Sequence, residues 1–158
     1  MFLDGGTTAV QFAHHLARDL RATVVTHSPS VAVVLTDHPT VKMELIGGWL
    51  FKHSVVAVGA AAVEAIARVR ADLYFMGVTG VHPEAGLTTG DKEKAAVRRA
   101  IAKQAAETVV LASAEKIGAA SPYLILPLSE MGTIIVDGRL PEEAAAAYRE
   151  LGVTLLTT

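Results

Sequence analysis

The strongest candidate for chemistry is a short glycine-rich stretch near the start of the chain. Asp4-Gly5-Gly6-Thr7-Thr8 separates a short apolar run from a segment with helical periodicity. Glycines let a backbone approach a phosphate closely, and the unpaired N–H groups at a helix start favour anions, so the stretch suits a phosphate loop. It is neither a Walker loop nor a G-x-G-x-x-G fingerprint. The alternative is a tight strand-to-helix turn with Thr7 or Thr8 as the helix cap, and the pattern alone favours neither.

Two further polar or glycine-rich stretches follow apolar runs. His27-Ser28 comes after Thr23–Thr26, and Gly47-Gly48 comes after Lys42–Ile46. Because the carboxyl ends of parallel strands meet at one edge of a sheet, we expect both stretches to lie near the first glycine-rich stretch. Glycine pairs at strand ends are often plain turns, so only this convergence supports a binding site.

A third glycine-rich stretch, Phe75–Asp91, leads into a basic helix that we expect Thr89 or Asp91 to cap. The basic residues of this helix are Lys92, Lys94, Arg98, Arg99 and Lys103. Cations near a helix start oppose the helix dipole, and Lys94 and Arg98 form a like-charge pair four residues apart. A bound anion would relieve this conflict, whereas a solvent-exposed basic face would need no ligand. Both interpretations stay open.

Other catalytic and metal-binding patterns do not occur in the sequence. Ser113-Ala114-Glu115-Lys116 fits S-x-x-K, but neither S-D-N nor K-T-G follows it. The sequence contains no G-x-S-x-G and no H-E-x-x-H motif. It contains no cysteine, which excludes disulfides and thiolate sites. We therefore expect no metal, no cofactor and no catalytic residue.

The elements that must position these residues alternate between apolar runs and Ala-rich helical stretches. Strands are predicted at Met1–Leu3, Thr23–Thr26, Lys42–Ile46, Leu73–Gly77, Thr108–Ala112, Thr133–Val136 and Val153–Leu156. Helices are predicted at Thr8–Leu20, Ser30–Asp37, Ala60–Arg70, Asp91–Ala106 and Pro141–Leu151. Several strands are continuously apolar, as a strand covered on both faces requires. The alternation predicts an α/β domain with a mostly parallel sheet between two helical layers.

Composition describes a single folded domain over residues 1–158. The chain is 51% hydrophobic and 19% charged, with a net charge of −2. This argues against disorder, and also against a DNA-binding module on its own, which usually carries a strongly basic face. No apolar run approaches the roughly 20 residues of a membrane span, and no signal sequence is seen, so we expect a cytoplasmic protein without a membrane partner. The first strand starts so abruptly that we expect the sequence to begin inside a longer protein.

An ordered set of motifs resembles the C-terminal sensor domain of DeoR-family transcriptional regulators. The motifs are Phe2–Thr8, Val24–Ser28, Leu45–Gly48, Phe75–Gly80, Gly86–Thr89, Ala112–Lys116, Pro127–Glu130 and Thr133–Asp137. The resemblance covers nearly the whole chain, although no single motif is decisive. It implies a three-layer, Rossmann-like fold similar to ribose-5-phosphate isomerase and glucosamine-6-phosphate deaminase. It also implies a bacterial regulator of carbohydrate metabolism, a repressor, whose effector is a phosphorylated sugar or a related anionic metabolite.

The resemblance also implies partners. Members of the family contact DNA through an N-terminal winged helix-turn-helix domain, which this sequence lacks, so we expect the chain to sense an effector without binding an operator itself. Repressors that read two half-sites are usually symmetric, so we expect a homo-oligomer. Its contacts could involve the Ala-rich helices 60–70 and 141–151, although alanine there could simply pack against the sheet.

Carried over residue by residue, the resemblance implies a ligand-binding set. Asp4 to Thr8 would form the phosphate loop, and Lys116 would pair with the phosphate or a sugar oxygen. The set is completed by His27, Ser28, Gly47, Gly48, Gly77, Gly80, Asp91, Lys94 and Arg98. The chain departs from the family where Thr79 replaces a common Asp and Lys94 a usual Glu, which favours a more anionic effector. Two further positions differ from the family: His27 stands where Asn is frequent, and Arg98 stands where Lys is frequent.

The alternative function is an active sugar-phosphate isomerase or deaminase on the same fold. Isomerisation needs a base beside the carbon acid and electrostatic support for the enediolate. The candidate groups are Asp4, Glu84, Asp91 and Lys116. Thr79 removes one carboxylate that related enzymes carry, which favours a sensor. A phosphoacceptor receiver domain is excluded, because the first strand ends in one acidic residue and the third ends in Ile46-Gly47-Gly48.

Overall fold

Seven parallel strands form the central sheet in a computed structural model that describes residues 1–136 and 140–158. Their order across the sheet is β12-β11-β9-β6-β1-β2-β3. The bounds are β1 Phe2–Leu3, β2 Thr23–Thr26, β3 Lys42–Leu45, β6 Ala71–Gly77, β9 Ala105–Ala112, β11 Thr133–Val136 and β12 Thr154–Thr157. These are the seven strands expected from the sequence, so the predicted parallel sheet is confirmed. Asp137, which ends the last motif of the family resemblance, lies outside the described residues.

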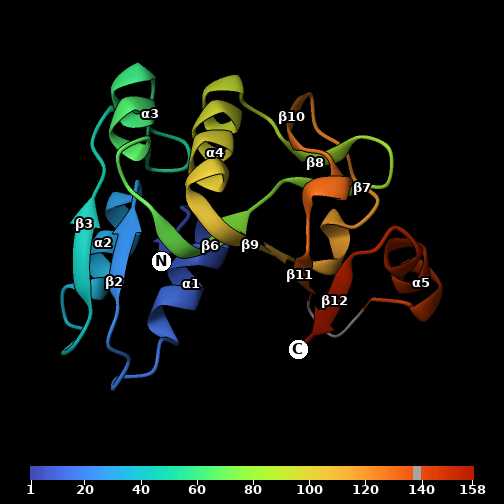
Figure 1. Cartoon of the computed structure of the whole chain (residues 1–158), viewed down its shortest axis with the longest axis horizontal. Coiled ribbons are helices and arrows are strands. Elements are labelled where there is room, and N and C mark those ends of the chain that lie inside the picture. Colours follow the sequence, from blue (N-terminus) through green and yellow to red (C-terminus); the bar gives the residue numbers. More distant parts are fainter. Residues whose placement is uncertain (137–139) are drawn as a thin grey trace.

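Helices cover both faces of this sheet (Figure 1). On one face lie α1 (Thr7–His14) and α2 (Pro29–Leu35), which share a small core with Leu3 and Val24. On the other face lie α3 (Ala60–Ile66), α4 (Lys92–Gln104) and α5 (Glu142–Glu150), over the larger core. Continuously apolar strands suit the inner positions of this three-layer arrangement, because an inner strand must pack against both layers. The predicted α/β fold class is therefore confirmed.

Two small antiparallel sheets, absent from the sequence prediction, are added to this frame. One contains β7 (Gly80–His82), β8 (Gly86–Thr89) and β10 (Tyr123–Leu126), in the order β10-β8-β7. The other pairs β4 (Trp49–Phe51) with β5 (Val56–Val58). Single 3-10 turns occur at Ala114–Lys116 and Leu128–Glu130. Each of these strands has only three or four residues, which is too short for an alternating pattern to be recognised in the sequence.

All five helices end earlier than the sequence indicated, α1 and α3 by the most residues. α1 ends at His14 and α3 at Ile66, and N–H groups beyond these ends bond three residues back, as His15 does to Phe12 and Arg68 does to Ala65. Neither Thr7 nor Thr8 caps α1: the cap is Gly6, whose φ of 93° suits glycine. The predicted cap Asp91 is confirmed for α4, since its carboxylate accepts from the N–H groups of Glu93 and Lys94. Among the described helices, none has the length and apolar character needed to cross a bilayer.

The C-terminal helix is attached to the small three-stranded sheet through one tyrosine. The Tyr148 side chain is buried, and its hydroxyl donates to the carbonyl of Val81 at 2.8 Å. The same hydroxyl accepts from the N–H of Gly118 at 3.0 Å. One oxygen therefore joins α5, β7 and the segment after β9.

We expect Tyr148→Phe to lower the free energy of unfolding by about 1–3 kcal/mol, because it leaves a carbonyl and an N–H without their partner. Urea unfolding measures this change. Tyr123→Phe is the matched control, because Tyr123 is exposed and its hydroxyl should contribute almost nothing. Equal stability of the two variants would contradict the bridging role of Tyr148.

Candidate functional site

A fully buried carboxylate lies at the end of β1. Oδ1 of Asp4 accepts hydrogen bonds from the N–H of Gly5 and from Nε2 of His27, each at 2.8 Å. Oδ2 accepts from the N–H of Gly77 and from Nε of Arg98, also at 2.8 Å. The four donors come from the loop after β1, the end of β2, the end of β6 and α4. Asp4 thus fastens together the elements at the carboxyl edge of the sheet.

Arg98 brings α4 into this cluster. Its side chain is only 10% exposed, and besides Asp4 it contacts Oγ1 of Thr89 through Nη1 at 2.9 Å. Burial alone would lower the pKa of the Arg98 guanidinium, but the charge of Asp4, the hydrogen bond to Asp4 and the neighbouring Tyr74 together raise the pKa above its usual value. Arg98 therefore has its counter-ion within the protein, and its predicted conflict with the helix dipole is relieved by Asp4.

The same balance applies to Asp4. Burial by itself would raise the pKa of the Asp4 carboxyl, but the charge of Arg98 and the hydrogen bond from His27 hold this pKa well below its usual range. Asp4 therefore stays ionised in the folded protein. A buried charge is tolerated only when it is paired and hydrogen-bonded, and this cluster meets both conditions.

His27 completes the cluster from the end of β2. Its Nδ1 lies 2.8 Å from the carbonyl oxygen of Ala57, and its Nε2 faces Asp4 on the other side. Both acceptors are satisfied when both ring nitrogens carry N–H. The ring thus ties β5 to the Asp4 loop and is itself almost completely buried.

The glycines around Asp4 are required by close packing. A Cβ on Gly5 would lie 2.2 Å from Cγ1 of Val56, so no other residue fits without a shift of the chain. A Cβ on Gly77 would lie 3.3 Å from Oδ2 of Asp4. Gly6 differs, because nothing lies within 4 Å of its Cβ position and the space beside it is open.

A pocket of about 540 Å³ opens beside Gly6. Its lining residues are Gly6, Thr7, Val10, Gln11, Ser30, His53, Ser54 and Val55. The start of α1 has no side-chain cap and no acidic residue in its first turn. Its first N–H groups are therefore free of a side-chain acceptor on the side where the pocket lies.

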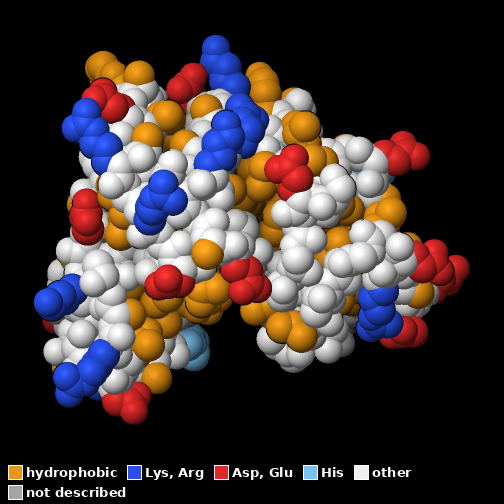
Figure 2. All heavy atoms as spheres, in the orientation of Figure 1, with side chains coloured by type: hydrophobic (Ala, Val, Ile, Leu, Met, Phe, Trp, Pro, Cys, Tyr) orange, Lys and Arg blue, Asp and Glu red, His pale blue; other side chains and the backbone are white. Residues whose placement is uncertain are grey.

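Lys94 contacts the loop between β4 and β5, and three residues of this loop line the pocket. Nζ of Lys94 donates to Oγ of Ser54 at 3.1 Å and lies 4.8 Å from the centre of the Phe51 ring. Partial burial, followed by the charge of Arg98, lowers the pKa of Lys94. Within the described residues Lys94 forms no ion pair, in contrast to Arg98. Figure 2 shows Lys and Arg side chains over α4 and beside it. The ammonium of Lys94 bonds to Ser54, which lines the pocket.

The structure brings together only part of the set expected from the sequence. Asp4, Gly5, His27, Gly77 and Arg98 form the buried cluster. Ser28 caps α2 and lies against Gly5, while Asp91 caps α4 one turn before Lys94. Gly6 and Thr7 line the pocket.

Other predicted residues lie apart from that pocket. Thr8 lines a separate hollow of about 590 Å³, between α1 and the ends of β9 and β11. Gly48 packs beneath β5, and Gly80 lies in β7 against the carbonyl of Ala119. Gly47 is exposed just after β3. Lys116 ends a 3-10 turn after β9, and no hydrogen bond or ion pair in the described parts of the chain joins its side chain to the Asp4 cluster.

Sequence reasoning missed the loop between β4 and β5. His53, Ser54 and Val55 line the pocket, and Val55 has a positive φ of 50°, which is unusual for a β-branched residue. Thr89, considered only as a helix cap, instead holds Arg98. No motif marks this loop, so only the fold could reveal its place beside Gly6.

Comparison with known proteins gives a consistent result. The family model described as the DeoR C-terminal sensor domain matches residues 1–138. The chain is 30% identical over 156 residues to the HTH-type transcriptional regulator GlpR of Haloferax volcanii, covering 99% of the chain and 61% of GlpR. It is 33% identical over 159 residues to the HTH-type transcriptional repressor GlcR of Bacillus subtilis, covering 100% of the chain and 60% of GlcR. The chain thus spans about three fifths of these relatives.

We expect Asp4→Asn to lower the free energy of unfolding by about 3–5 kcal/mol, because it leaves Arg98 buried without its counter-ion. Urea unfolding of this variant, with the exposed Asp19→Asn as the control, measures the effect. A loss for Asp4→Asn no larger than that for Asp19→Asn would contradict the anchoring role of Asp4.

The depressed pKa of Asp4 also predicts how stability depends on pH. The stabilisation is fully present above the pKa of an unfolded aspartate, about 3.9, and is lost as the pH falls from there toward the folded-state pKa. Unfolding of the parent protein from pH 7 to pH 3 should therefore show an acid-dependent loss that is smaller in Asp4→Asn. Parallel curves for the two proteins would show that another group causes the loss.

Proposed function

This chain belongs to the DeoR C-terminal sensor domain family, and we propose that it binds a phosphorylated sugar or a related anionic metabolite in the pocket beside Gly6. The proposed ligand is the effector of a transcriptional regulator. Its phosphate would lie at the start of α1, and Ser54, His53 and Lys94 would face it from the opposite wall of the pocket.

The observation that carries this proposal is the uncapped start of α1 beside an open pocket. Helix N-termini attract anions through unpaired N–H groups and the helix dipole. Here Gly6 supplies the bend, no side chain occupies the N–H groups, and no acidic residue stands in the first turn. Gly6 and Thr7 at this start line the pocket, and Lys94 donates to Ser54, another of its lining residues.

The buried cluster is proposed to position this site without touching the ligand. All four hydrogen bonds of Asp4 are made inside the protein, and Arg98 is occupied by Asp4 and Thr89. These contacts hold the Gly5–Gly6 turn against β2 and β6. A rigid turn keeps the N–H groups pointed at the phosphate before it binds, which lowers the entropic cost of binding.

The hydrogen bonds within the protein also favour an effector-binding domain over an enzyme. Asp4 and Asp91, two carboxylates considered as a base for isomerisation, already accept hydrogen bonds from the protein. The relatives GlpR and GlcR are named as transcriptional regulators. We propose that effector binding here shifts the population of regulator states and so changes operator affinity. The DNA contact itself would be made by a helix-turn-helix domain outside residues 1–158.

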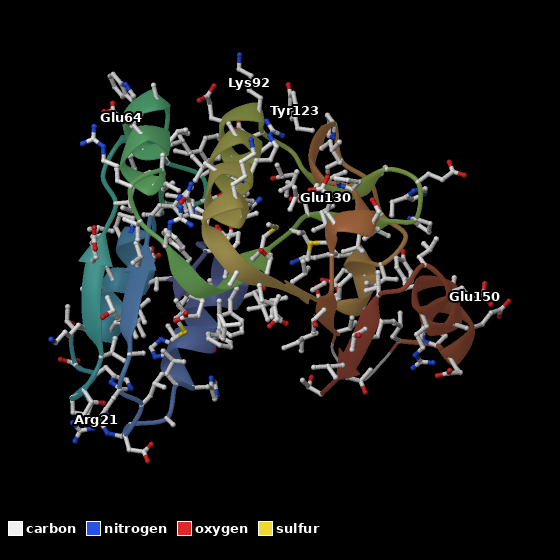
Figure 3. The ribbon with its side chains drawn as sticks, in the orientation of Figure 1. Arg21, Glu64, Lys92, Tyr123, Glu130 and Glu150 are labelled. Atoms are coloured by element: carbon white, nitrogen blue, oxygen red, sulfur yellow. The ribbon has the colours of Figure 1, made fainter. Side chains whose placement is uncertain are left out.

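Titration with a panel of sugar phosphates, by thermal shift and then calorimetry, tests the proposed ligand. We expect at least one phosphorylated sugar to raise the melting temperature, and its unphosphorylated form not to. Lys94→Met should weaken that binding by about tenfold or more, because it removes a charged donor while keeping the apolar stem. Lys92→Met is the matched control, because Lys92 is exposed at the outer end of the same helix (Figure 3). Absence of any phosphate-dependent shift, or equal effects of the two substitutions, would overturn the proposal.

Binding should also depend on alkaline pH. The pKa of Lys94 is lowered by burial and by Arg98, and a bound phosphate would raise it again. A phosphate monoester is already a dianion above neutral pH, so affinity should fall as the pH rises through the Lys94 pKa of the free protein. Calorimetry in two buffers should detect proton uptake on binding that Lys94→Met abolishes. Uptake that survives in Lys94→Met would assign the proton to another group.

A further inference from the structure

The outer edge of the central sheet at β3 is open. β3 pairs with β2 on one side, and no described strand pairs with its other side (Figure 1). All four of its residues are exposed. An exposed parallel edge presents unpaired N–H and C=O groups that can pair with another strand.

The direction of the free backbone groups is known from the β2 pairing. The N–H of Lys42 bonds to Ala22 at 2.9 Å, and that of Ile46 bonds to Thr26 at 2.8 Å. Even-numbered residues therefore direct their backbone groups toward β2, since these groups alternate along a strand. Met43 and Leu45 direct theirs outward.

The side chains divide the edge into a charged face and an apolar face. Glu44 is in register with Val25, which belongs to the larger core beneath α3 and α4, so Lys42 and Glu44 stand on that face. Met43 is in register with Val24, which belongs to the core beneath α1 and α2. Met43 and Leu45 are 37% and 48% exposed on this second face.

We propose that β3 pairs antiparallel with β3 of a second copy of this chain, about a two-fold axis centred on Met43. In that register Met43 faces its own copy, Leu45 faces Val41, and Lys42 faces Glu44 on each side of the axis. Met43 and its copy exchange backbone hydrogen bonds, and the two charge pairs occupy the closer, non-hydrogen-bonded positions. Two seven-stranded sheets then continue into one another.

The outward backbone groups can also pair in two neighbouring registers, one centred on Lys42 and one centred on Glu44. The charges of Lys42 and Glu44 favour the register centred on Met43. A shift centred on Lys42 would place Lys42 against its own copy, and a shift centred on Glu44 would place Glu44 against its own copy. Like charges directly opposite are destabilising, whereas opposite charges stabilise a cross-strand pair. The sequence Lys42-Met43-Glu44 is thus complementary to itself in the Met43-centred register. An isologous contact of this kind closes at a dimer.

Charge reversal tests the pairing by sedimentation of the 158-residue chain across a concentration series. Lys42→Glu and Glu44→Lys should each weaken the dimer by about tenfold or more, since each places like charges opposite one another twice. The double variant K42E/E44K should return the dimer Kd to near that of the parent. Rescue distinguishes charge pairing from a general loss of structure. A monomeric parent, or a double variant as weak as the single ones, would overturn the proposal.

Cross-linking tests the register independently, because the sequence has no cysteine of its own. Facing Cα atoms in a hydrogen-bonded antiparallel pair lie about 5.5 Å apart, within the range for a disulfide. Met43→Cys should therefore form a disulfide-linked dimer under mild oxidation, and adding Lys42→Glu should reduce its yield. Leu124→Cys is the control, because Leu124 is 49% exposed on the edge strand β10. Equal dimer yields from Met43→Cys and Leu124→Cys would contradict the proposed interface.

Discussion

The buried charge of Asp4 is the constraint on which the functional edge of this domain depends. A carboxylate removed from water needs donors for its oxygens and a counter-ion. Asp4 obtains them from Gly5, His27, Gly77 and Arg98, which belong to four separate segments. All four donors bond to the same carboxylate. The loop after β1 therefore cannot move without breaking the contacts of Asp4 to β2, β6 and α4. The position of the proposed phosphate loop is therefore a consequence of burying one charge.

This arrangement separates the groups that hold the site from those that can meet a ligand. Asp4, His27 and Arg98 bond to one another, to Thr89 and to the backbone. The groups that we propose meet the ligand are the first N–H groups of α1 and the ammonium of Lys94, all electropositive. The electropositive character of these groups is the reason why the proposed ligand is an anion.

The proposed ligand pocket and the proposed dimer edge lie on the same half of the sheet. His27 follows the end of β2, and β2 pairs along its length with β3, whose other side pairs with no strand that the structure describes. The loop that follows β3 leads directly to β4 and then to the pocket residues His53 and Ser54. A short stretch of chain thus joins the two proposed sites.

The sequence by itself determined the seven parallel strands, the five helices and the carboxyl edge where Asp4, His27 and Gly77 meet. Continuous apolar runs such as Thr108–Ala112 carry that information locally, because a strand buried on both faces needs apolar residues at every position. Only the tertiary structure decided which charges are paired. Arg98 and Lys94 look alike as basic residues of one helix, yet α4 is oriented so that Arg98 reaches Asp4 and Lys94 reaches Ser54. Lys94 and Ser54 are 40 residues apart in the sequence, and Arg98 and Asp4 are 94 residues apart. Contacts between residues so far apart produce no pattern in the local sequence. The role of a charged side chain depends on what the fold places against it.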